Sequence, residues 1–289
     1  MNHHKFKKKV KLRKKYKYLL YILLIFLFCL YINKNNKINK SFKKTSKEYV
    51  FKNILNIKSL KNISEEDSHK SVETFTIKED KTESPLVYLY NTHDTEKYQE
   101  INGLNFKPSI VNATDYLNEK LNNAGISSIH EKRSMASYLV ENNLNYSSSY
   151  KASRFYLNDT TSNNPSIKYL FDIHRDSGKK EYTTYCSENK CYAKFLFLIG
   201  LENENYQDNE NFALILSKKL NEKVPGISKG IMQKKGPKVN GVYNEDFSNR
   251  TLLIEVGGEN NTIEEVYNSL DVLSEVLISF IKEEIKNGR

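Results

Sequence analysis

The sequence predicts an α/β fold in which helices cover both faces of a mainly parallel sheet, preceded by a transmembrane helix and a stalk. Two observations support this prediction. From Pro85 onward, short apolar β-prone runs alternate with amphipathic helical segments, a pattern typical of parallel strands connected by helices. Ahead of that region, a basic segment runs directly into an uncharged apolar one. With 289 residues, 38% of them hydrophobic, the chain can form one well-buried domain of roughly 200 residues.

The basic residues are concentrated at the amino terminus. Residues 1–50 contain 15 Lys and Arg and one acidic residue, Glu48, for a net charge of +14. The remaining residues contain 30 basic and 34 acidic side chains, for a net charge of −4. The globular part therefore has no excess positive charge, and we expect it not to bind nucleic acid.

Residues 18–32 (YLLYILLIFLFCLYI) are expected to anchor the chain in the cell membrane. They carry no charge. As a helix they would be roughly 22 Å long, short of the ~30 Å hydrocarbon core, although Lys17 and Lys34 can snorkel toward the two interfaces. A cleaved signal peptide is the alternative, but no small-residue cleavage site follows. We expect a single-pass anchor, a basic cytoplasmic tail (1–17), and the rest of the chain outside the cytoplasm.

The region after the anchor divides into a stalk and a catalytic domain. Residues 33–84 are rich in Lys, Asn, Ser and Glu with scattered apolar residues, which is typical of a linker. The domain is expected to comprise residues 85–289. Its elements, in chain order, are a strand at Leu86–Tyr90, a helix near Val111–Gly125, a strand ending at His130, a helix near Tyr150–Leu157, a strand at Tyr169–Ile173, a cysteine-containing hairpin, a helix near Phe212–Leu220, a strand at Thr251–Val256 and a final amphipathic helix.

Two cysteines bracket a four-residue segment between β-prone runs. Cys186 and Cys191 would face each other across a hairpin, so a disulfide is possible outside the cytoplasm. Two unpaired thiols are the alternative. A structural zinc site would need two more ligands nearby, and none is visible.

Three predicted strands end in residues that are capable of catalysis. His93 follows the first strand, His174 ends YLFDIH, and Glu255 lies in TLLIEV. In open α/β sheets, ligands bind beyond the carboxyl ends of the strands. Three such residues at one edge therefore indicate a site.

These residue types suit a catalytic zinc site. Zinc enzymes commonly use three protein ligands and leave a fourth position open. His93 and His174 would supply two ligands, and Glu96 the third, because its spacing from His93 lets both side chains point the same way in a helical bend. His130 is the alternative third ligand. Glu255 would act as the general base.

Each of these residues also has a structural interpretation. A histidine after a strand is commonly a surface residue or one held by hydrogen bonds. Arg175 and Asp176 could form a surface salt bridge, or Asp176 could orient a ligand histidine. Glu255 is harder to explain structurally, because a buried carboxylate without a partner is costly.

Three segments, NTHDTEKY, FDIHRDS and LLIEVGGENNTIEEV, resemble in that order the stage II sporulation protein P family, which is related in fold to zinc-dependent N-acetylmuramoyl-L-alanine amidases. The segment VPGISKGI is also similar to that family, and the resemblance covers roughly residues 85–285. It implies an amidase-like fold, with His93 and His174 as zinc ligands and Glu255 as the catalytic glutamate. Amidases of the wider superfamily take a glutamate from the first helix, where this chain has VNATDYL, so Glu96 is preferred as the middle ligand and His130 is kept as the alternative.

The resemblance further implies a membrane-anchored peptidoglycan hydrolase that cleaves the amide between N-acetylmuramic acid and L-alanine, with additional endopeptidase activity. It implies a role in septal wall degradation and engulfment during sporulation, alongside sporulation proteins D and M. One alternative is a catalytically inactive, anchored cell-wall-binding or scaffolding protein. Another is a zinc peptidase that acts only within the stem peptide.

Overall fold

The computed structural model describes residues 84–101, 105–187 and 190–288. All of them belong to the second of the chain's two structural units, Lys78–Arg289. The predicted tail (1–17), membrane span (18–32) and nearly all of the stalk (33–84) lie outside the described residues. None of the helices described is both long and apolar enough to span a bilayer.

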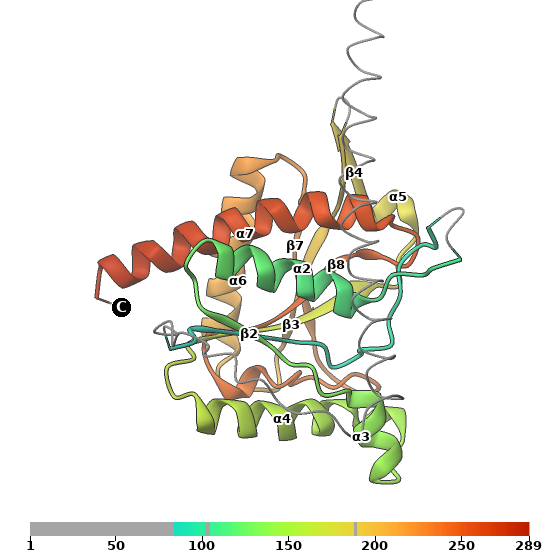
Figure 1. Cartoon of the computed structure of the whole chain (residues 1–289), viewed down its shortest axis with the longest axis vertical. Coiled ribbons are helices and arrows are strands. Elements are labelled where there is room, and N and C mark those ends of the chain that lie inside the picture. Colours follow the sequence, from blue (N-terminus) through green and yellow to red (C-terminus); the bar gives the residue numbers. More distant parts are fainter. Residues whose placement is uncertain (1–83, 102–104, 188–189, 289) are drawn as a thin grey trace, which may run out of the picture. The chain divides into compact units, whose positions relative to one another are not determined.

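A six-stranded sheet with the order β2-β1-β3-β8-β6-β7 lies at the centre of this unit (Figure 1). Strands β2, β1, β3 and β8 are mutually parallel, β6 is antiparallel to β8, and β7 is parallel to β6. The α/β prediction is confirmed, with one antiparallel pairing in the sheet. The strands are β1 (Val87–Tyr90), β2 (Ser128–His130), β3 (Tyr169–Asp176), β6 (Phe195–Gly200), β7 (Ser228–Lys234) and β8 (Thr251–Gly258).

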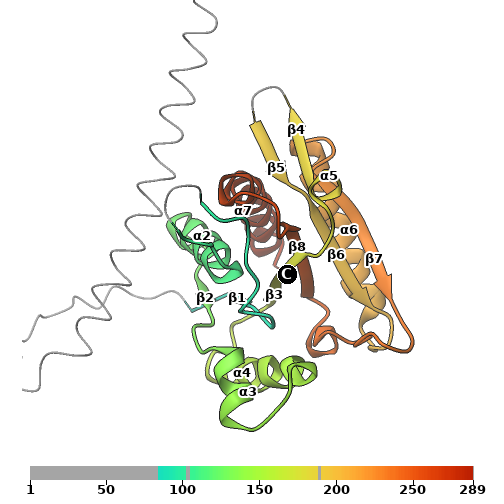
Figure 2. The same ribbon diagram turned by 90° about the vertical axis from the view of Figure 1, so that its right-hand side faces the viewer.

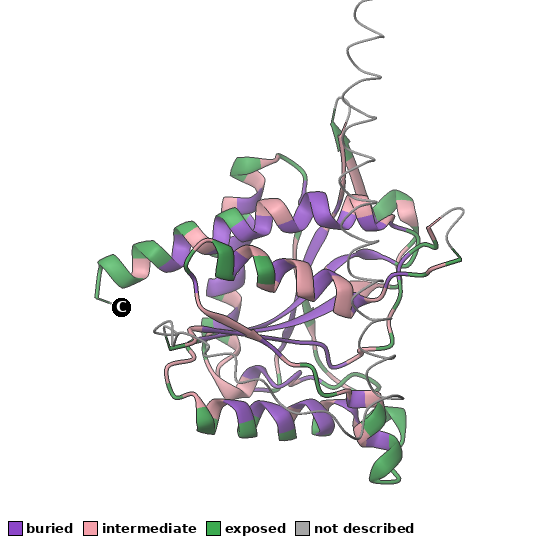
Figure 3. Ribbon diagram, in the orientation of Figure 1, coloured by how far each residue is buried: buried purple, intermediate pink, exposed green. Residues whose placement is uncertain are grey.

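Helices cover both faces of the sheet, as predicted (Figures 1 and 2). On one face, Phe212 of α6 lies between Phe171 of β3 and Phe280 of α7, with ring centroids 6.1 and 5.4 Å apart. On the other face, Leu157 of α4 packs with Tyr88 and other strand residues. Figure 3 shows the buried residues gathered in the sheet and on the helix sides that face it. The helices are α2 (Ile110–Asn123), α3 (Met135–Glu141), α4 (Ser149–Asn163), α6 (Tyr206–Lys223) and α7 (Ile263–Lys286).

The sequence of α7 explains why it forms a long helix against the sheet. The Thr262 side chain accepts a hydrogen bond from the Glu265 backbone N–H, and the Glu265 side chain accepts one from the Thr262 N–H, which together satisfy two free donors of the first turn. Apolar residues then recur every three or four positions and are buried. Helix α2 ends before Gly125, whose φ of +78° is accessible to glycine at little cost.

Beyond the carboxyl edge of the sheet, the chain forms a separate hairpin. After β3, the short helix α5 (Lys180–Thr183) leads into β4 (Thr184–Ser187) and β5 (Lys190–Ala193), which project from the body of the unit (Figure 2). Cys186 and Cys191 face each other across it and form a disulfide. The structure thus answers the question of pairing that the sequence left open.

The hairpin also explains the antiparallel strand. Strand β3 ends at the carboxyl edge of the sheet, and α5, β4 and β5 stay beyond that edge. The next strand, β6, therefore enters the sheet from this edge and runs antiparallel to β8. The edge strand β7 and the short helix α3 were not predicted. Most residues of β7 are only partly buried or exposed, so its sequence, SKGIMQK, lacks the apolar run of a central strand.

Candidate active site

The predicted residues meet at the carboxyl ends of β1, β3 and β8. His174 and Glu255 are register partners on the adjacent parallel strands β3 and β8. Partners in a sheet project their side chains to the same face, so the imidazole and the carboxylate are neighbours. His93 lies in the loop after β1, and its ring centroid is 5.2 Å from that of His174, with the rings nearly perpendicular at 85°.

His93 is held between aromatic side chains. The ring of Tyr146, from the 3₁₀ turn Tyr146–Ser148, stacks on it with a centroid distance of 4.6 Å and an interplanar angle of 16°. Tyr150 of α4 approaches it edge-on at 5.7 Å. Burial, followed by the nearby charge of His174, lowers the pKa of His93 to about 4. His93 is therefore neutral at physiological pH, and its buried Nδ1 has no hydrogen-bond partner.

Asp172 connects the two histidine-bearing segments. Its fully buried carboxylate accepts hydrogen bonds from the backbone N–H (2.9 Å) and the hydroxyl (2.6 Å) of Thr92, the residue before His93. Its Oδ1 also lies 2.9 Å from His174 Nε2, close enough for an ion pair although the geometry is not that of a hydrogen bond. Burial alone would lower the pKa of His174, but Asp172, then Glu96 and Glu255, raise this pKa to about 9.

Glu96 takes the bend that the sequence predicted. Its backbone N–H donates to the carbonyl oxygen of His93 at 3.0 Å, which closes a turn and brings both side chains to one side. Glu96 Oε2 lies 3.7 Å from His174 Nδ1 and accepts a hydrogen bond from the backbone N–H of Arg175 at 3.0 Å. Burial raises the pKa of the Glu96 carboxyl, while His174 and Arg175 lower it.

Glu255 is the residue predicted to act as the general base. Its Oε2 is buried and has no hydrogen-bond partner. Burial raises its pKa to about 7, against the lowering effect of His174. A carboxylate with a pKa near neutrality can both accept and return a proton at neutral pH.

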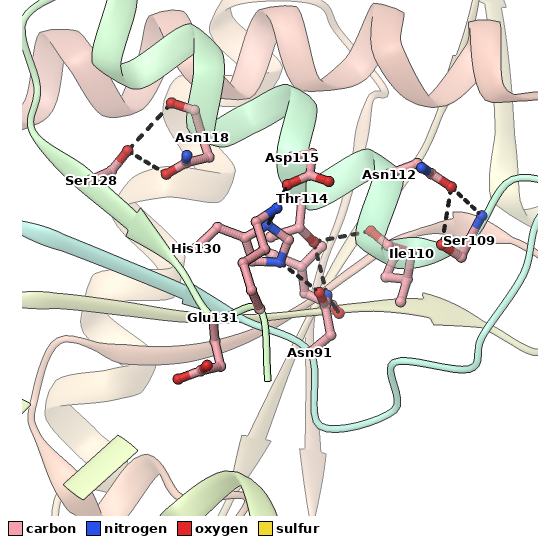
Figure 4. Close-up of polar contacts among 12 residues, drawn as sticks. Asn91, Ser109, Ile110, Asn112, Thr114, Asp115, Asn118, Ser128, His130 and Glu131 are labelled. Atoms are coloured by element: carbon pink, nitrogen blue, oxygen red, sulfur yellow. Dashed lines mark hydrogen bonds and ion pairs between the residues drawn. The ribbon is translucent and has the colours of Figure 1, made fainter. Parts of the chain in front are cut away.

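His130, the alternative third ligand, lies in a different polar cluster (Figure 4). Its Nδ1 is 2.7 Å from Asp115 Oδ1 of α2, and its Nε2 is 3.1 Å from Asn91 Oδ1. Asn91 in turn donates to Thr114 Oγ1 and to the carbonyl oxygen of Ile173. Because both imidazole nitrogens of His130 are engaged, neither is directed at His93 or His174.

Neither suggestion for the Arg175-Asp176 pair holds in the structure. Asp176 Oδ2 pairs with Lys229 of β7 at 2.7 Å, and its Oδ1 accepts from the Gly178 N–H. Asp176 therefore neither pairs with the Arg175 guanidinium nor orients a site histidine. Asp172 makes the histidine contact instead, because residues two apart on a strand share a face.

Sequence reasoning missed Asp172 and Tyr146. A signal for Asp172 was present, since a carboxylate inside the apolar run YLFDI is as unexpected as Glu255 inside TLLIEV. Tyr146 had no comparable signal, because it reaches His93 only through the packing of α4.

The residues present suit a zinc ion in their chemistry. Two imidazoles and a carboxylate form a common zinc ligand set, and the buried Nδ1 of His93 has no hydrogen-bond partner. Across the residues described, no three His, Cys, Asp or Glu side chains are already arranged as a metal site.

Comparisons with known proteins identify a family. The profile of "Stage II sporulation protein P (SpoIIP)" matches residues 27–278. Stage II sporulation protein P of Bacillus subtilis (strain 168) is 34% identical over 199 residues, which cover 66% of this chain and 50% of that protein. The chain thus spans half the length of this relative.

Two solved structures are similar to the chain at lower identity. An N-acetylmuramoyl-L-alanine amidase from Clostridium difficile 630 is 14% identical with a TM-score of 0.43, covering 71% of this chain and 98% of its own. The amidase Ami1 from Mycobacterium smegmatis is 10% identical with a TM-score of 0.41, covering 70% and 99%. Because the family profile matches most of its residues, this chain belongs to the stage II sporulation protein P family.

Proposed function

We propose that this chain is a zinc-dependent peptidoglycan hydrolase that cleaves the amide between N-acetylmuramic acid and L-alanine. The observation that carries the proposal is the convergence of His93, Glu96, His174 and Glu255 at one edge of the sheet. Membership of a sporulation family supports a role in degrading the septal wall during sporulation. Endopeptidase activity on stem peptides would use the same residues.

In this proposal His93, Glu96 and His174 would hold the zinc ion. When bound, zinc would act as a Lewis acid that polarises the scissile carbonyl and lowers the pKa of water. Asp172 keeps His174 and the segment carrying His93 in place through its contacts with His174 and Thr92. Tyr146 covers one face of the His93 ring.

Glu255 performs the proton transfers. As a carboxylate it accepts a proton from the attacking water while the water oxygen bonds to the carbonyl carbon. As a carboxylic acid it then donates that proton to the amide nitrogen as the carbon–nitrogen bond breaks, and L-alanine leaves with a free amine. Burial raises the pKa of this carboxyl toward neutrality, which suits both steps because neither protonation state is then strongly disfavoured.

The proposal extends to the cell membrane and to partners. Residues 18–32 would anchor the chain, placing the hydrolase outside the cytoplasm against the wall. Sporulation proteins D and M are the proposed partners in septal wall degradation and engulfment.

The ligand assignment is tested by measuring bound zinc and released wall fragments for the purified full chain. We expect His174→Ala and Glu96→Gln to lose both zinc and activity, and His130→Gln, the matched control, to keep both. Loss of zinc in His130→Gln but not in Glu96→Gln would make His130 the third ligand. Full activity and unchanged zinc in His174→Ala would overturn the site.

A further inference from the structure

Arg175 differs from the other arginines that the structure describes. Each of the others forms an ion pair: Arg133 with Glu131 and Asp159, Arg154 with Asp246, and Arg250 with Glu284. Arg175 makes no ion pair with any described residue, and the contact of its guanidinium is a long one, Nη1 to the carbonyl oxygen of Asp176 at 3.4 Å. Its Nε is buried and has no hydrogen-bond partner.

An unpartnered buried donor on a permanently charged group is unfavourable. A guanidinium has five N–H donors and stays protonated in proteins. Leaving such a donor buried and unsatisfied destabilises the protein. Arg175 is half-buried rather than enclosed, so a ligand can reach the group. A partner that arrives with the substrate would supply the missing acceptor.

The position of Arg175 ties it to the candidate active site. It directly follows His174 on β3, so its side chain leaves the strand on the opposite face from the imidazole, and its backbone N–H donates to Glu96 Oε2 of the site. Its positive charge acts on the carboxyls of both Glu96 and Glu255, although neither forms an ion pair with it. The guanidinium thus lies within electrostatic reach of the site, and the carboxylates there are assigned to zinc and to proton transfer.

We propose that the Arg175 guanidinium binds a free carboxylate on the peptide side of the scissile bond. The proposal rests on the proposed function and specifies its substrate. Guanidinium groups match carboxylates in a bidentate geometry. A stem peptide that continues through the γ-carboxyl of a glutamate after L-alanine keeps a free α-carboxylate one residue from the cleaved bond. In peptides where that group is a carboxamide, the charge is absent.

The test compares two muramoyl peptides that differ only in a carboxylate or a carboxamide at that position, with the full chain and its variants. We expect the wild type to prefer the carboxylate at least tenfold in kcat/KM, mainly through KM. Arg175→Gln should hydrolyse both peptides at the rate of the wild type on the carboxamide. Arg175→Lys should keep part of the preference, because lysine retains the positive charge but cannot form the two parallel hydrogen bonds of a guanidinium. Lys151→Gln, an exposed control on α4 that removes the same charge, should behave as wild type.

A preference that persists unchanged in Arg175→Gln would overturn the proposal, since a merely structural role would slow both peptides equally. Binding of the free stem peptides, measured calorimetrically, gives a readout that does not require hydrolysis. If the wild type cleaves neither muramoyl peptide, the proposed function fails, and the binding measurement still decides the role of Arg175. Equal affinity of the wild type for the carboxylate and carboxamide forms would also overturn it.

Discussion

His174 on β3 and Glu255 on β8 are register partners in adjacent parallel strands, so an imidazole and a carboxylate lie side by side at the carboxyl edge of the sheet. Glu255 Oε2 is buried without a hydrogen-bond partner, a costly arrangement that is typical of functional sites. The predicted zinc ligand His174 therefore lies next to the predicted general base, Glu255.

Replacing Glu255 should separate catalysis from metal binding. Glu255→Gln removes the proton acceptor but keeps the size of the side chain, so we expect kcat to fall by roughly 10²- to 10⁴-fold with bound zinc unchanged. Glu259→Gln, an exposed neighbour, is the control and should retain activity. Kinetics together with metal analysis checks both expectations, and an active Glu255→Gln would remove Glu255 from the mechanism.

Asp172 should control zinc affinity. Because its carboxylate contacts both Thr92 and His174, Asp172→Asn is expected to weaken zinc binding by about 10- to 100-fold. Competition with a chromogenic chelator measures the affinity, with the exposed Asp208→Asn as control. An unchanged affinity would mean that Asp172 serves the fold alone, a role that thermal unfolding would report separately.

Tyr146 should contribute to substrate binding. One face of its ring stacks on His93, yet 62% of the residue remains exposed and available to a sugar or peptide. We expect Tyr146→Ala to raise KM by about 2- to 10-fold, given the ~0.5–1.5 kcal/mol of an aromatic contact, and Tyr146→Phe to stay near wild type. A lower kcat with unchanged KM in Tyr146→Ala would instead indicate that the ring only orients His93.

Glu245 should make stability depend on pH. This residue of the 3₁₀ turn Glu245–Phe247 accepts a hydrogen bond from the Gly200 N–H at 2.7 Å, and its Oε1 has no partner. Burial raises its pKa from 4.5 to about 8. Between those values the native state holds a proton that the unfolded state has released, so the free energy of unfolding falls as pH rises through this window.

The size of this effect is on the order of a few kcal/mol, because one pKa unit corresponds to about 1.4 kcal/mol. Denaturant unfolding at a series of pH values measures it. Glu245→Gln cannot titrate and should flatten the profile, whereas the exposed Glu204→Gln should keep the wild-type slope. An equally steep profile in Glu245→Gln would assign the dependence to other groups.

The central strands could be predicted from the sequence because they are buried on both faces. The runs YLFDI and TLLIEV contain several consecutive apolar residues, as expected of strands covered by helices on both sides. Strand β7 and helix α3 lie at the periphery and bury fewer side chains, so their sequences show no comparable period. The direction of β6 depends on the position of the hairpin beyond the carboxyl edge of the sheet, and no local sequence pattern specifies that position.

Only the site residues at or just after the ends of predicted strands could be predicted from the sequence. His93, His174 and Glu255 each end or follow an apolar run, and parallel strands bring such ends together. The contact between Asp172 and Thr92 joins residues 80 positions apart, and the partners of His130 come from α2 and from Asn91, the residue after β1. Contacts of this kind depend on tertiary packing, so the sequence left Glu96 and His130 as alternatives.

Mass spectrometry of purified peptidoglycan after digestion by the full chain identifies the bond that is cleaved. We predict that the wild type releases intact stem peptides with a new L-alanine amino terminus and that Glu255→Gln releases none. Digestion that produces no such amino terminus, or the same products from Glu255→Gln, would contradict the assignment of this edge of the sheet as an amidase site.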